Sequence, residues 1–325
     1  MKRLFPVLAV ALALVSVAVW AQAAFPEKGK AISVIMPWPP GGPNDIGARV
    51  LAPLMEKELG VPVQIVNKPG AGSQVGITQL AQAKPDGYTL GVTALPTTIQ
   101  IYVNPERQSA FGRKSLLPIA THTLDPLAVA VKASSPFKTL KELIDYAKAN
   151  PGKLRAGTGG LLTITHFGII QFEKATGAQF SIVHFEGGPQ QMTALLGGHV
   201  DVNFDFPTQF MGNVKSGEMR ALGVMDRSEH PYLPGVKTIE AQGHPIYSAT
   251  ARVWSAPAGT PKEIVDTLAA SIKKVMETDE HKKKIADLGM LPRFMTADQT
   301  AKYWDETEAQ IRPIMLDELA KQRKK

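Results

Sequence analysis

The chain of 325 residues contains no cysteine, and this absence excludes disulfide bonds, thiolate metal centres and a lipid attachment site behind the N-terminal segment. Its seven histidines form neither a His-x-His nor a His-Glu-x-x-His pattern, so the sequence gives little support to a metal site. A Gly-x-Ser-x-Gly elbow is also missing, which argues against a serine hydrolase of that design. We therefore expect no metal and no catalytic residue.

Long apolar runs are missing too, except at the N-terminus. Lys2 and Arg3 precede an apolar run over 4–20, and Ala21-Gln22-Ala23 follows it. A basic start, an apolar middle and a small-x-small end are typical of a secretory signal peptide, and the run is short for a membrane anchor. We expect residues 1–23 to be a signal peptide that is removed after export.

The charge balance is basic, with a formal net charge of +7. Loss of Lys2 and Arg3 with the signal peptide leaves +5. Basic residues are scattered and not interleaved with aromatic ones, so nucleic acid is excluded as a partner. The excess charge favours only a mild attraction for anions.

Short apolar runs alternate with amphipathic stretches through most of the chain, which predicts an α/β fold with parallel sheets flanked by helices. One segment differs, because Val200–Phe206 alternates strictly between apolar and polar residues. That pattern predicts a strand with one packed face and one face toward water or a cleft, with Asp201 and Asn203 on the solvated side. The expected strands are 32–36, 63–66, 88–93, 128–131, 181–185 and 221–225, and the expected C-terminal helices are 262–276, 281–288 and 297–319.

A turn rich in proline and glycine follows the first expected strand. The glycine pair Gly41-Gly42 lets the backbone approach a ligand closely, and the surrounding prolines stiffen the loop. Asn44 or Asp45 is placed to cap the helix that follows. A helix N-terminus attracts anions, although an acidic cap would compete with them, so a rigid structural turn is the alternative.

A second turn of this kind spans 156–166 and leads into a helix that Gly177 closes. It offers backbone N–H groups and the hydroxyls of Thr158 and Thr163, which bind a carboxylate without needing a fixed cation. Two such loops from separate halves of the chain can close on a small anion from opposite sides. A third glycine cluster at 69–76 has the wrong spacing for a dinucleotide fingerprint and predicts only a tight turn, so no cofactor is expected.

Eight segments in this order resemble the periplasmic substrate-binding proteins of tripartite tricarboxylate transporters, the Bug family. They cover essentially the whole chain after the signal peptide. The segments are PWPPGGPND at 37–45, VNKPGAG at 66–72, KPDGYTL at 84–90, GTGG at 157–160, FEGGP at 185–189, LGGHVD at 196–201, GEMRALG at 217–223 and APAGTP at 256–261.

The resemblance implies a two-lobed, hinged protein of the Venus flytrap type that shuts on its ligand. Lobe one would comprise 24–126 plus 252–325, and lobe two would comprise 127–251. A carboxylate would lie between the first glycine turn and the second, held largely by N–H groups and hydroxyls. Carried over to this chain, the ligand-binding residues are Trp38, Gly41, Gly42, Asn44, Asp45, Thr93, Thr158, Gly160, Thr163 and Asp205.

The chain departs from the family pattern at several positions. Leu162 stands where glycine is usual, which changes the backbone freedom of the second turn, and Trp38 stands where phenylalanine is usual. Arg252 lies at the expected hinge return, where it can meet a second carboxylate of a longer ligand or form a salt bridge. His166 is expected to orient the second loop.

The resemblance therefore implies a periplasmic binding protein, expected to be a monomer, that delivers a small carboxylate to the membrane subunits of a transporter. A dicarboxylate is favoured because Arg252 and several hydroxyls can serve a second acid group. Monocarboxylates, amino acids, tricarboxylates and aromatic acids stacked on Trp38 stay open. The alternatives are a periplasmic sensor that docks on a receptor and a secreted enzyme that acts on carboxylates.

Overall fold

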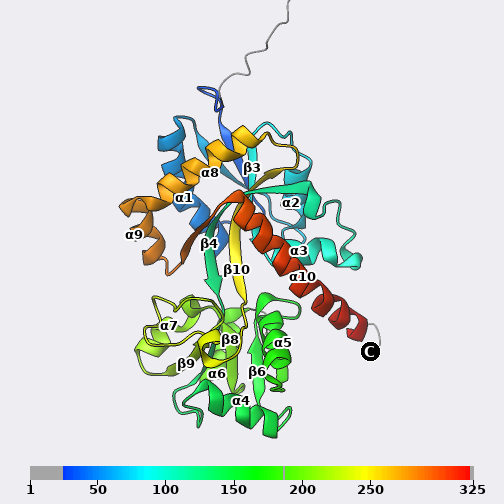
Figure 1. The fold of residues 1–325 in the computed structure, drawn as a ribbon, viewed down its shortest axis with the longest axis vertical. Helices are drawn as coiled ribbons and strands as arrows, with labels where there is room; N and C mark the ends of the chain where they lie inside the picture. The colour runs from blue at the N-terminus through cyan, green and yellow to red at the C-terminus, as the bar shows by residue number, and fades with distance from the viewer. Residues whose placement is uncertain (1–24, 186, 323–325) are drawn as a thin grey trace, which may run out of the picture.

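The strands of the computed structural model gather into two separate sheets, each covered by helices (Figure 1). The structure describes residues 25–185 and 187–322, so the predicted signal peptide lies outside the described residues. We call the part built on the first sheet lobe one and the part built on the second sheet lobe two. The two-lobed α/β fold expected from the sequence is confirmed.

Lobe one contains a sheet of six strands in the order β11-β4-β10-β3-β1-β2. Its strands are β1 (Ile32–Met36), β2 (Val63–Asn67), β3 (Thr89–Leu95), β4 (Leu116–Pro126), β10 (Ala249–Pro257) and β11 (Pro292–Met295). Its helices are α1 (Pro43–Leu59), α2 (Gln74–Ala81), α3 (Thr97–Val103), α8 (Lys262–Glu277), α9 (Asp279–Asp287) and α10 (Ala297–Gln322), with 3-10 turns at Pro105–Arg107 and Arg113–Ser115.

Lobe two contains a sheet of five strands in the order β7-β6-β8-β5-β9. Its strands are β5 (Ala128–Lys132), β6 (Arg155–Thr158), β7 (Ser181–His184), β8 (Val202–Asp205) and β9 (Met219–Val224). Its helices are α4 (Leu140–Ala149), α5 (Ile164–Thr176), α6 (Gly188–Leu196) and α7 (Pro207–Lys215), and a 3-10 turn, Glu240–Gln242, follows them.

Both sheets are mixed and not mostly parallel as the alternation of strands and helices predicted. In lobe one β1 pairs in parallel with β2 and β3, whereas β10 runs antiparallel to β3 and β4. In lobe two β6 pairs in parallel with β7 and β8, whereas β5 runs antiparallel to β8 and β9. In lobe one the antiparallel partner is β10, which returns from lobe two, whereas in lobe two it is β5, which directly continues β4.

Strands β4 and β10 form the connection between the lobes: β4 runs toward lobe two, and β10 returns from it to lobe one (Figure 1). They are paired from Leu116 opposite Pro257 to Pro126 opposite Ala249. Beyond the last pair, the Leu127 N–H donates to the Ser248 carbonyl at 2.8 Å. This two-stranded ribbon is the hinge of the molecule, and the lobe boundary expected between 251 and 252 falls inside β10.

A second connection between the lobes is made by α10, which starts in lobe one and descends beside α5 of lobe two (Figure 1). Phe167 and Ile170 of α5 share one buried apolar cluster with Ile311, Ile314 and Met315 of α10. Burial of apolar surface in this cluster holds the lobes together at the side of the hinge.

Two local expectations are wrong. Neither face of β8 meets water, because Asn203 is fully buried and Asp205 is only 2% exposed: β8 is an inner strand with α5 and α6 packed on it. Asn44 and Asp45 do not cap α1. The N-cap residue is Gly42, and it makes no side-chain capping bond.

Candidate ligand-binding cleft

A cavity of about 480 Å³ lies between the two lobes and takes its walls from both. The start of α1 and the region of α3 contribute from lobe one, the loop before α5 contributes from lobe two, and β10 contributes Thr250 and Arg252. The lining residues are Pro43, Asn44, Ala94, Thr97, Gln100, Asn104, Arg107, Leu161, Leu162, Thr163, Ile164, Phe206, Thr250, Arg252 and Met315.

The first glycine turn is held in shape by Asp45. Its Oδ2 accepts hydrogen bonds from the Gly41 N–H at 3.0 Å and from Arg49 Nε at 2.9 Å, and its Oδ1 accepts from Asn67 Nδ2 at 2.8 Å. Gly41 has φ +86°, a left-handed conformation that glycine adopts without strain. Asp45 is buried and uses both oxygens on the protein, so it positions the turn.

The carboxyl of Asp45 is ionised in this setting. Burial alone would raise its pKa, but the hydrogen bonds from Arg49, the Gly41 N–H and Asn67 outweigh the burial, so the pKa is lowered from its ordinary value. Trp38 lies just before this turn, and its carbonyl accepts from Asn67 Nδ2 at 2.9 Å, while its side chain packs on the core of lobe one. The Trp38 side chain does not line the cavity.

Arg252 joins the hinge strand to the first turn. Its Nε donates to Asn44 Oδ1 at 2.7 Å and its Nη1 donates to Thr123 Oγ1 at 3.0 Å. The same Nη1 pairs with the carboxylate of Asp125. The two roles considered for Arg252 coexist, since it forms a buried ion pair and also lines the cleft.

The second glycine turn is stabilised by its own hydroxyls. Thr158 Oγ1 donates to the Gly160 carbonyl and accepts from the Gly160 N–H, both at 3.0 Å. Thr163 is the N-cap of α5: it accepts from the His166 N–H and donates to the Gly160 carbonyl at 2.7 Å. Thr158 is fully buried, and of these residues only Thr163 lines the cleft.

His166 orients this turn, as the sequence predicted, because its Nδ1 accepts the Leu162 N–H at 3.1 Å. Burial, helped by the neighbouring His184, lowers the pKa of His166 to about 4, so the ring is neutral and accepts. Leu162 has φ +58°, a conformation that glycine adopts more easily. Because of this departure from the family pattern, a leucine with a strained backbone lines the cleft.

Among the predicted site residues, Asn44, Thr163 and Arg252 line the cleft and the others do not, and two of these others are buried elsewhere. Thr93 is fully buried inside the sheet of lobe one, where its hydroxyl bonds with Ser255 Oγ at 2.9 Å. Asp205 is buried at the end of β8, where its Oδ1 accepts the Phe206 N–H at 2.8 Å. Its Oδ2 has no hydrogen-bond partner among the described residues, and burial raises its pKa to about 7. Neither side chain lines the cavity.

Sequence reasoning missed the contribution of α3. Thr97, Gln100 and Asn104 line the cleft, and Gln100 Nε2 is a buried donor without a hydrogen-bond partner in the described part of the chain. Their position in the chain could have revealed them as cleft residues, because they follow the carboxyl end of β3. Ligands of α/β sheets bind at the carboxyl ends of strands.

The polar lining of the cleft is suited to an anion. Arg107 and Arg252 are among the lining residues, whereas aspartate and glutamate are not. Asp125 offsets part of the Arg252 charge, and Arg107 lies in the 3-10 turn after α3, where its Nη1 donates to the Ala71 carbonyl at 2.8 Å. Gln100, Asn104, Thr97 and Thr163 add neutral donors, which bind a carboxylate through charge-assisted hydrogen bonds.

Among the residues that the structure describes, three or more His, Asp or Glu side chains do not come together in a way that could hold a metal ion. Within 25–185 and 187–322, none of the helices is both long and apolar enough to span a bilayer.

Two hinged α/β lobes with a polar cleft between them define a solute-binding protein of the periplasmic type. Residues 47–319 match the TctC family, described as "Tripartite tricarboxylate transporter family receptor". The chain belongs to this family, which includes the Bug proteins. The resemblance seen in the sequence is thereby confirmed.

Two curated relatives illustrate the family. The chain is 33% identical over 296 residues to the "UPF0065 protein in gbd 5'region" of Cupriavidus necator, a match that covers 90% of this chain and 88% of the relative. It is 29% identical over 274 residues to "Protein BugT" of Bordetella pertussis, covering 83% of each chain.

Two solved structures share the fold. A TctC solute-binding protein from Polaromonas, without ligand, has a TM-score of 0.83 and 25% identity, covering 90% of this chain and 99% of that one. MatC from Rhodopseudomonas palustris, with bound malate, has a TM-score of 0.67 and 26% identity, covering 90% of this chain and 100% of that one. The first of these neighbours is described as a solute-binding protein, and the second holds malate.

Proposed function

We propose that this protein is a periplasmic receptor that captures a small organic carboxylate, with a dicarboxylate favoured, and delivers it to the membrane subunits of a tripartite tricarboxylate transporter. One observation carries the proposal: the cleft presents Arg252 and the buried Gln100 Nε2 without an acidic lining residue. The malate bound by MatC, a structural neighbour, supports the class of ligand.

In this proposal one carboxylate lies between Asn44 at the start of α1 and Thr163 at the start of α5. The second acid group meets Arg252, whose bonds to protein groups in the described residues use Nε and Nη1, so that Nη2 serves the ligand. Gly41, Gly42 and Asp45 shape the first turn, and Thr158 and Gly160 shape the second. Ligand contact by Trp38, Thr93 and Asp205 stays a prediction from the family resemblance.

The lobes supply binding energy by closing. Micromolar affinity corresponds to about 8 kcal/mol, and a closing hinge brings the donors of both lobes onto one anion while it removes them from water. We take lobe one as 24–126 plus 252–325 and lobe two as 127–251. The protein acts as a monomer in the periplasm, after export directed by residues 1–23 and removal of that signal peptide. The chain acts as a carrier and makes no chemical change in the ligand.

The test is a thermal-shift panel of mono-, di- and tricarboxylates that includes malate. A ligand at one hundred times its Kd stabilises the protein by about 2.7 kcal/mol, which raises the unfolding midpoint visibly. We expect dicarboxylates to give the largest rise. If none of the acids moves the midpoint, the proposal is wrong.

A variant pair locates the binding. Arg252→Gln combined with Asp125→Asn removes one of the two cationic lining residues of the cleft without leaving a buried carboxylate unpaired. We expect this double variant to lose the dicarboxylate shift. The matched control is Arg312→Gln, which changes an arginine paired with Glu308 on the outside of α10 and should keep the full shift.

A further inference from the structure

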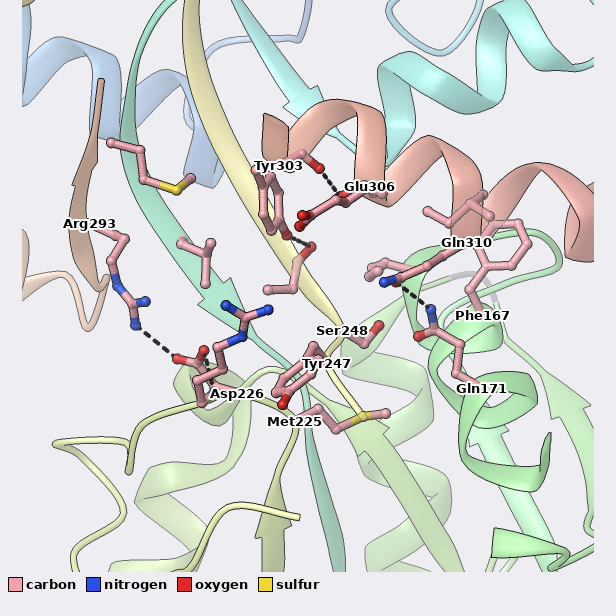
Figure 2. Close-up of a pocket in the computed structure, with 17 residues that line it drawn as sticks. Phe167, Gln171, Met225, Asp226, Tyr247, Ser248, Arg293, Tyr303, Glu306 and Gln310 are labelled. Atoms are coloured by element: carbon pink, nitrogen blue, oxygen red, sulfur yellow. Dashed lines mark hydrogen bonds and ion pairs between the residues drawn. The ribbon is translucent and has the colours of Figure 1, made fainter. Parts of the chain in front are cut away.

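A second cavity lies on the other face of the hinge strand. Neighbouring residues of a strand point to opposite faces. Thr250 and Arg252 of β10 line the cleft, whereas Ala249 of the same strand lines this second cavity. Leu124 of β4 lines it as well. The two cavities therefore lie on opposite faces of β10, with Ile164 of α5 lining both, and we call the second one the hinge cavity (Figure 2).

Both lobes build its walls. Phe167 and Gln171 come from α5 of lobe two, whereas Tyr303 and Gln310 come from α10 of lobe one, and Figure 2 shows them facing a common space. Side-chain bonds cross from lobe to lobe at its edges. Arg293 Nη2 pairs with Asp226 Oδ2 at 2.9 Å, and Gln171 Nε2 donates to Gln310 Oε1 at 3.5 Å. Movement of one lobe against the other must change the shape of this cavity.

The size and lining of the hinge cavity indicate the class of molecule that fits it. Its volume is about 160 Å³, and an apolar cavity of about 150 Å³ is known to hold one benzene ring. Phe167, Met225 and Ile311 give it an apolar surface. The charged lining residues balance, because Asp226 and Glu306 stand against Arg227 and Arg293. A neutral ring-sized molecule meets these conditions.

Two buried polar atoms in the wall of the hinge cavity have no hydrogen-bond partner among the described residues. Ser248 Oγ and Gln171 Oε1 are each buried, and neither has a hydrogen-bond partner within the described residues. Both residues line the hinge cavity. A buried polar group without a partner costs free energy, so a ligand hydroxyl that donates to Gln171 Oε1 or bonds with Ser248 Oγ is favoured there.

We propose that the hinge cavity is a second binding site, for a small neutral aromatic alcohol, and that its occupation changes how readily the lobes close. The ring lies on Phe167 and Met225, and the hydroxyl bonds with Ser248 or Gln171. Because both lobes form the walls, an occupant that prefers one lobe arrangement shifts the affinity of the main cleft, and the main ligand shifts the affinity of this site by the same factor. The closure part of this inference rests on the proposed function, whereas the binding part does not.

The probe is 4-fluorophenol, followed by its fluorine NMR signal in a titration with the full protein. We expect saturable binding in the millimolar range or tighter. Thr307→Phe projects a ring from α10 into the cavity that Thr307 lines, and it should weaken binding at least about tenfold by occupying the volume. Leu316→Phe is the matched control, because it adds a ring at an exposed position of the same helix and should change the Kd less than about twofold.

A second variant covers the case in which Thr307→Phe does not fold. Ser248→Ala removes one hydroxyl and should weaken 4-fluorophenol about fivefold, the effect of one hydrogen bond. Absence of saturable binding up to the solubility of the probe would overturn the proposal. Equal binding by wild type, Thr307→Phe and Ser248→Ala would overturn it as well.

The double variant Arg252→Gln/Asp125→Asn distinguishes the two cavities. It should bind 4-fluorophenol as wild type does, and loss of binding would place the probe in the main cleft and contradict the site. For the closure part, saturation with an acid identified by the thermal-shift panel should change the Kd of 4-fluorophenol at least about threefold. An unchanged Kd would refute the coupling between the two sites. If none of the acids in the thermal-shift panel stabilises the protein, the proposed function is refuted, but the 4-fluorophenol titration still tests the hinge cavity as a binding site.

Discussion

Asn44 and Arg252, which are 208 positions apart in the chain, meet through a hydrogen bond of 2.7 Å from Arg252 Nε to Asn44 Oδ1. The bond ties the hinge strand β10 to the first turn of α1, at the point where both line the cleft. Because Asp125 holds the other side of the guanidinium, the arginine is fixed in position before any ligand arrives. A fixed cation binds a planar carboxylate with less loss of side-chain entropy than a mobile one.

The first prediction concerns this bond. Asn44→Ala removes the acceptor of Arg252 Nε and should weaken binding of a dicarboxylate about fivefold, which corresponds to about 1 kcal/mol for one hydrogen bond. Asn44→Asp adds a negative charge beside the ligand and should weaken binding more. Titration calorimetry measures both. Asn213→Ala, which removes a surface amide paired with Glu218, is the control and should bind as wild type does. If both Asn44 variants bind the dicarboxylate as tightly as wild type, the first glycine turn is not part of the ligand-binding site.

The second prediction concerns the left-handed backbone of Leu162. Alanine and glycine both remove the leucine side chain, but only glycine relieves the strain of φ +58°. Leu162→Gly should therefore be more stable than Leu162→Ala by about 1 kcal/mol. Urea unfolding of the two variants gives this difference directly. An alanine variant as stable as the glycine variant would show that the backbone is not left-handed there.

The third prediction concerns the pH dependence that Asp205 gives to stability. The pKa of Asp205 is about 7 in the folded protein, whereas an ordinary aspartate has a pKa of 3.8. Between pH 3.8 and pH 7 the folded state therefore keeps a proton on this carboxyl that the unfolded state has lost. Stability should fall as pH rises from about 4 to about 7 and should change no further above that range. Asp205→Asn mimics the protonated form without titrating.

The measurement for Asp205 is the difference in unfolding free energy between wild type and Asp205→Asn across this pH range. The wild type should lose stability relative to the variant as pH rises, by up to about 4 kcal/mol. A difference that stays constant with pH would show that the carboxyl is not held neutral by burial.

The fourth prediction concerns a buried histidine pair of lobe one. His122 Nε2 and His281 Nε2 are 2.8 Å apart, so one ring donates and the other accepts. Burial lowers the pKa of His281 to about 4, and burial together with His281 and Arg252 lowers the pKa of His122 well below 6.5. As pH falls below 6.5, the unfolded state therefore binds protons that the folded state does not bind. The free energy of unfolding should decrease for this reason between pH 6.5 and about pH 4.

The variant His281→Gln keeps a hydrogen-bonding side chain without the titration. Between pH 7 and pH 5 it should lose less stability than wild type, as chemical denaturation at the two pH values will show. Equal losses in the two proteins would mean that the pair takes up protons in the folded state.

Local patterns predicted much of this fold. The strand at 32–36 and the long helices after 261 follow from apolar spacing within a few residues, and the structure has them nearly at the expected bounds. The hinge strands escaped prediction. The β4 segment contains Pro118, His122 and Asp125, which weaken the strand pattern, and these residues are buried by tertiary contacts: β10 and β11 pair with β4, and helices pack on it.

The site shows the same limit. The glycine turns were visible because turn chemistry is local, and the role of His166 follows from its place at a helix start. The burial of Asp205 depends on α6 covering β8, and the cleft contribution of Gln100 depends on where α3 lies, so neither appears in the spacing of nearby residues. The Asn44–Arg252 bond joins distant segments and needs the folded chain to be seen.

A crystal structure with the dicarboxylate that gives the largest thermal shift tests the central claim most directly. The account predicts closed lobes, one acid group between Asn44 and the start of α5 at Thr163, and the second acid group on Arg252. An acid bound at any other place, or bound in this cleft by one lobe alone with the lobes apart, would contradict it.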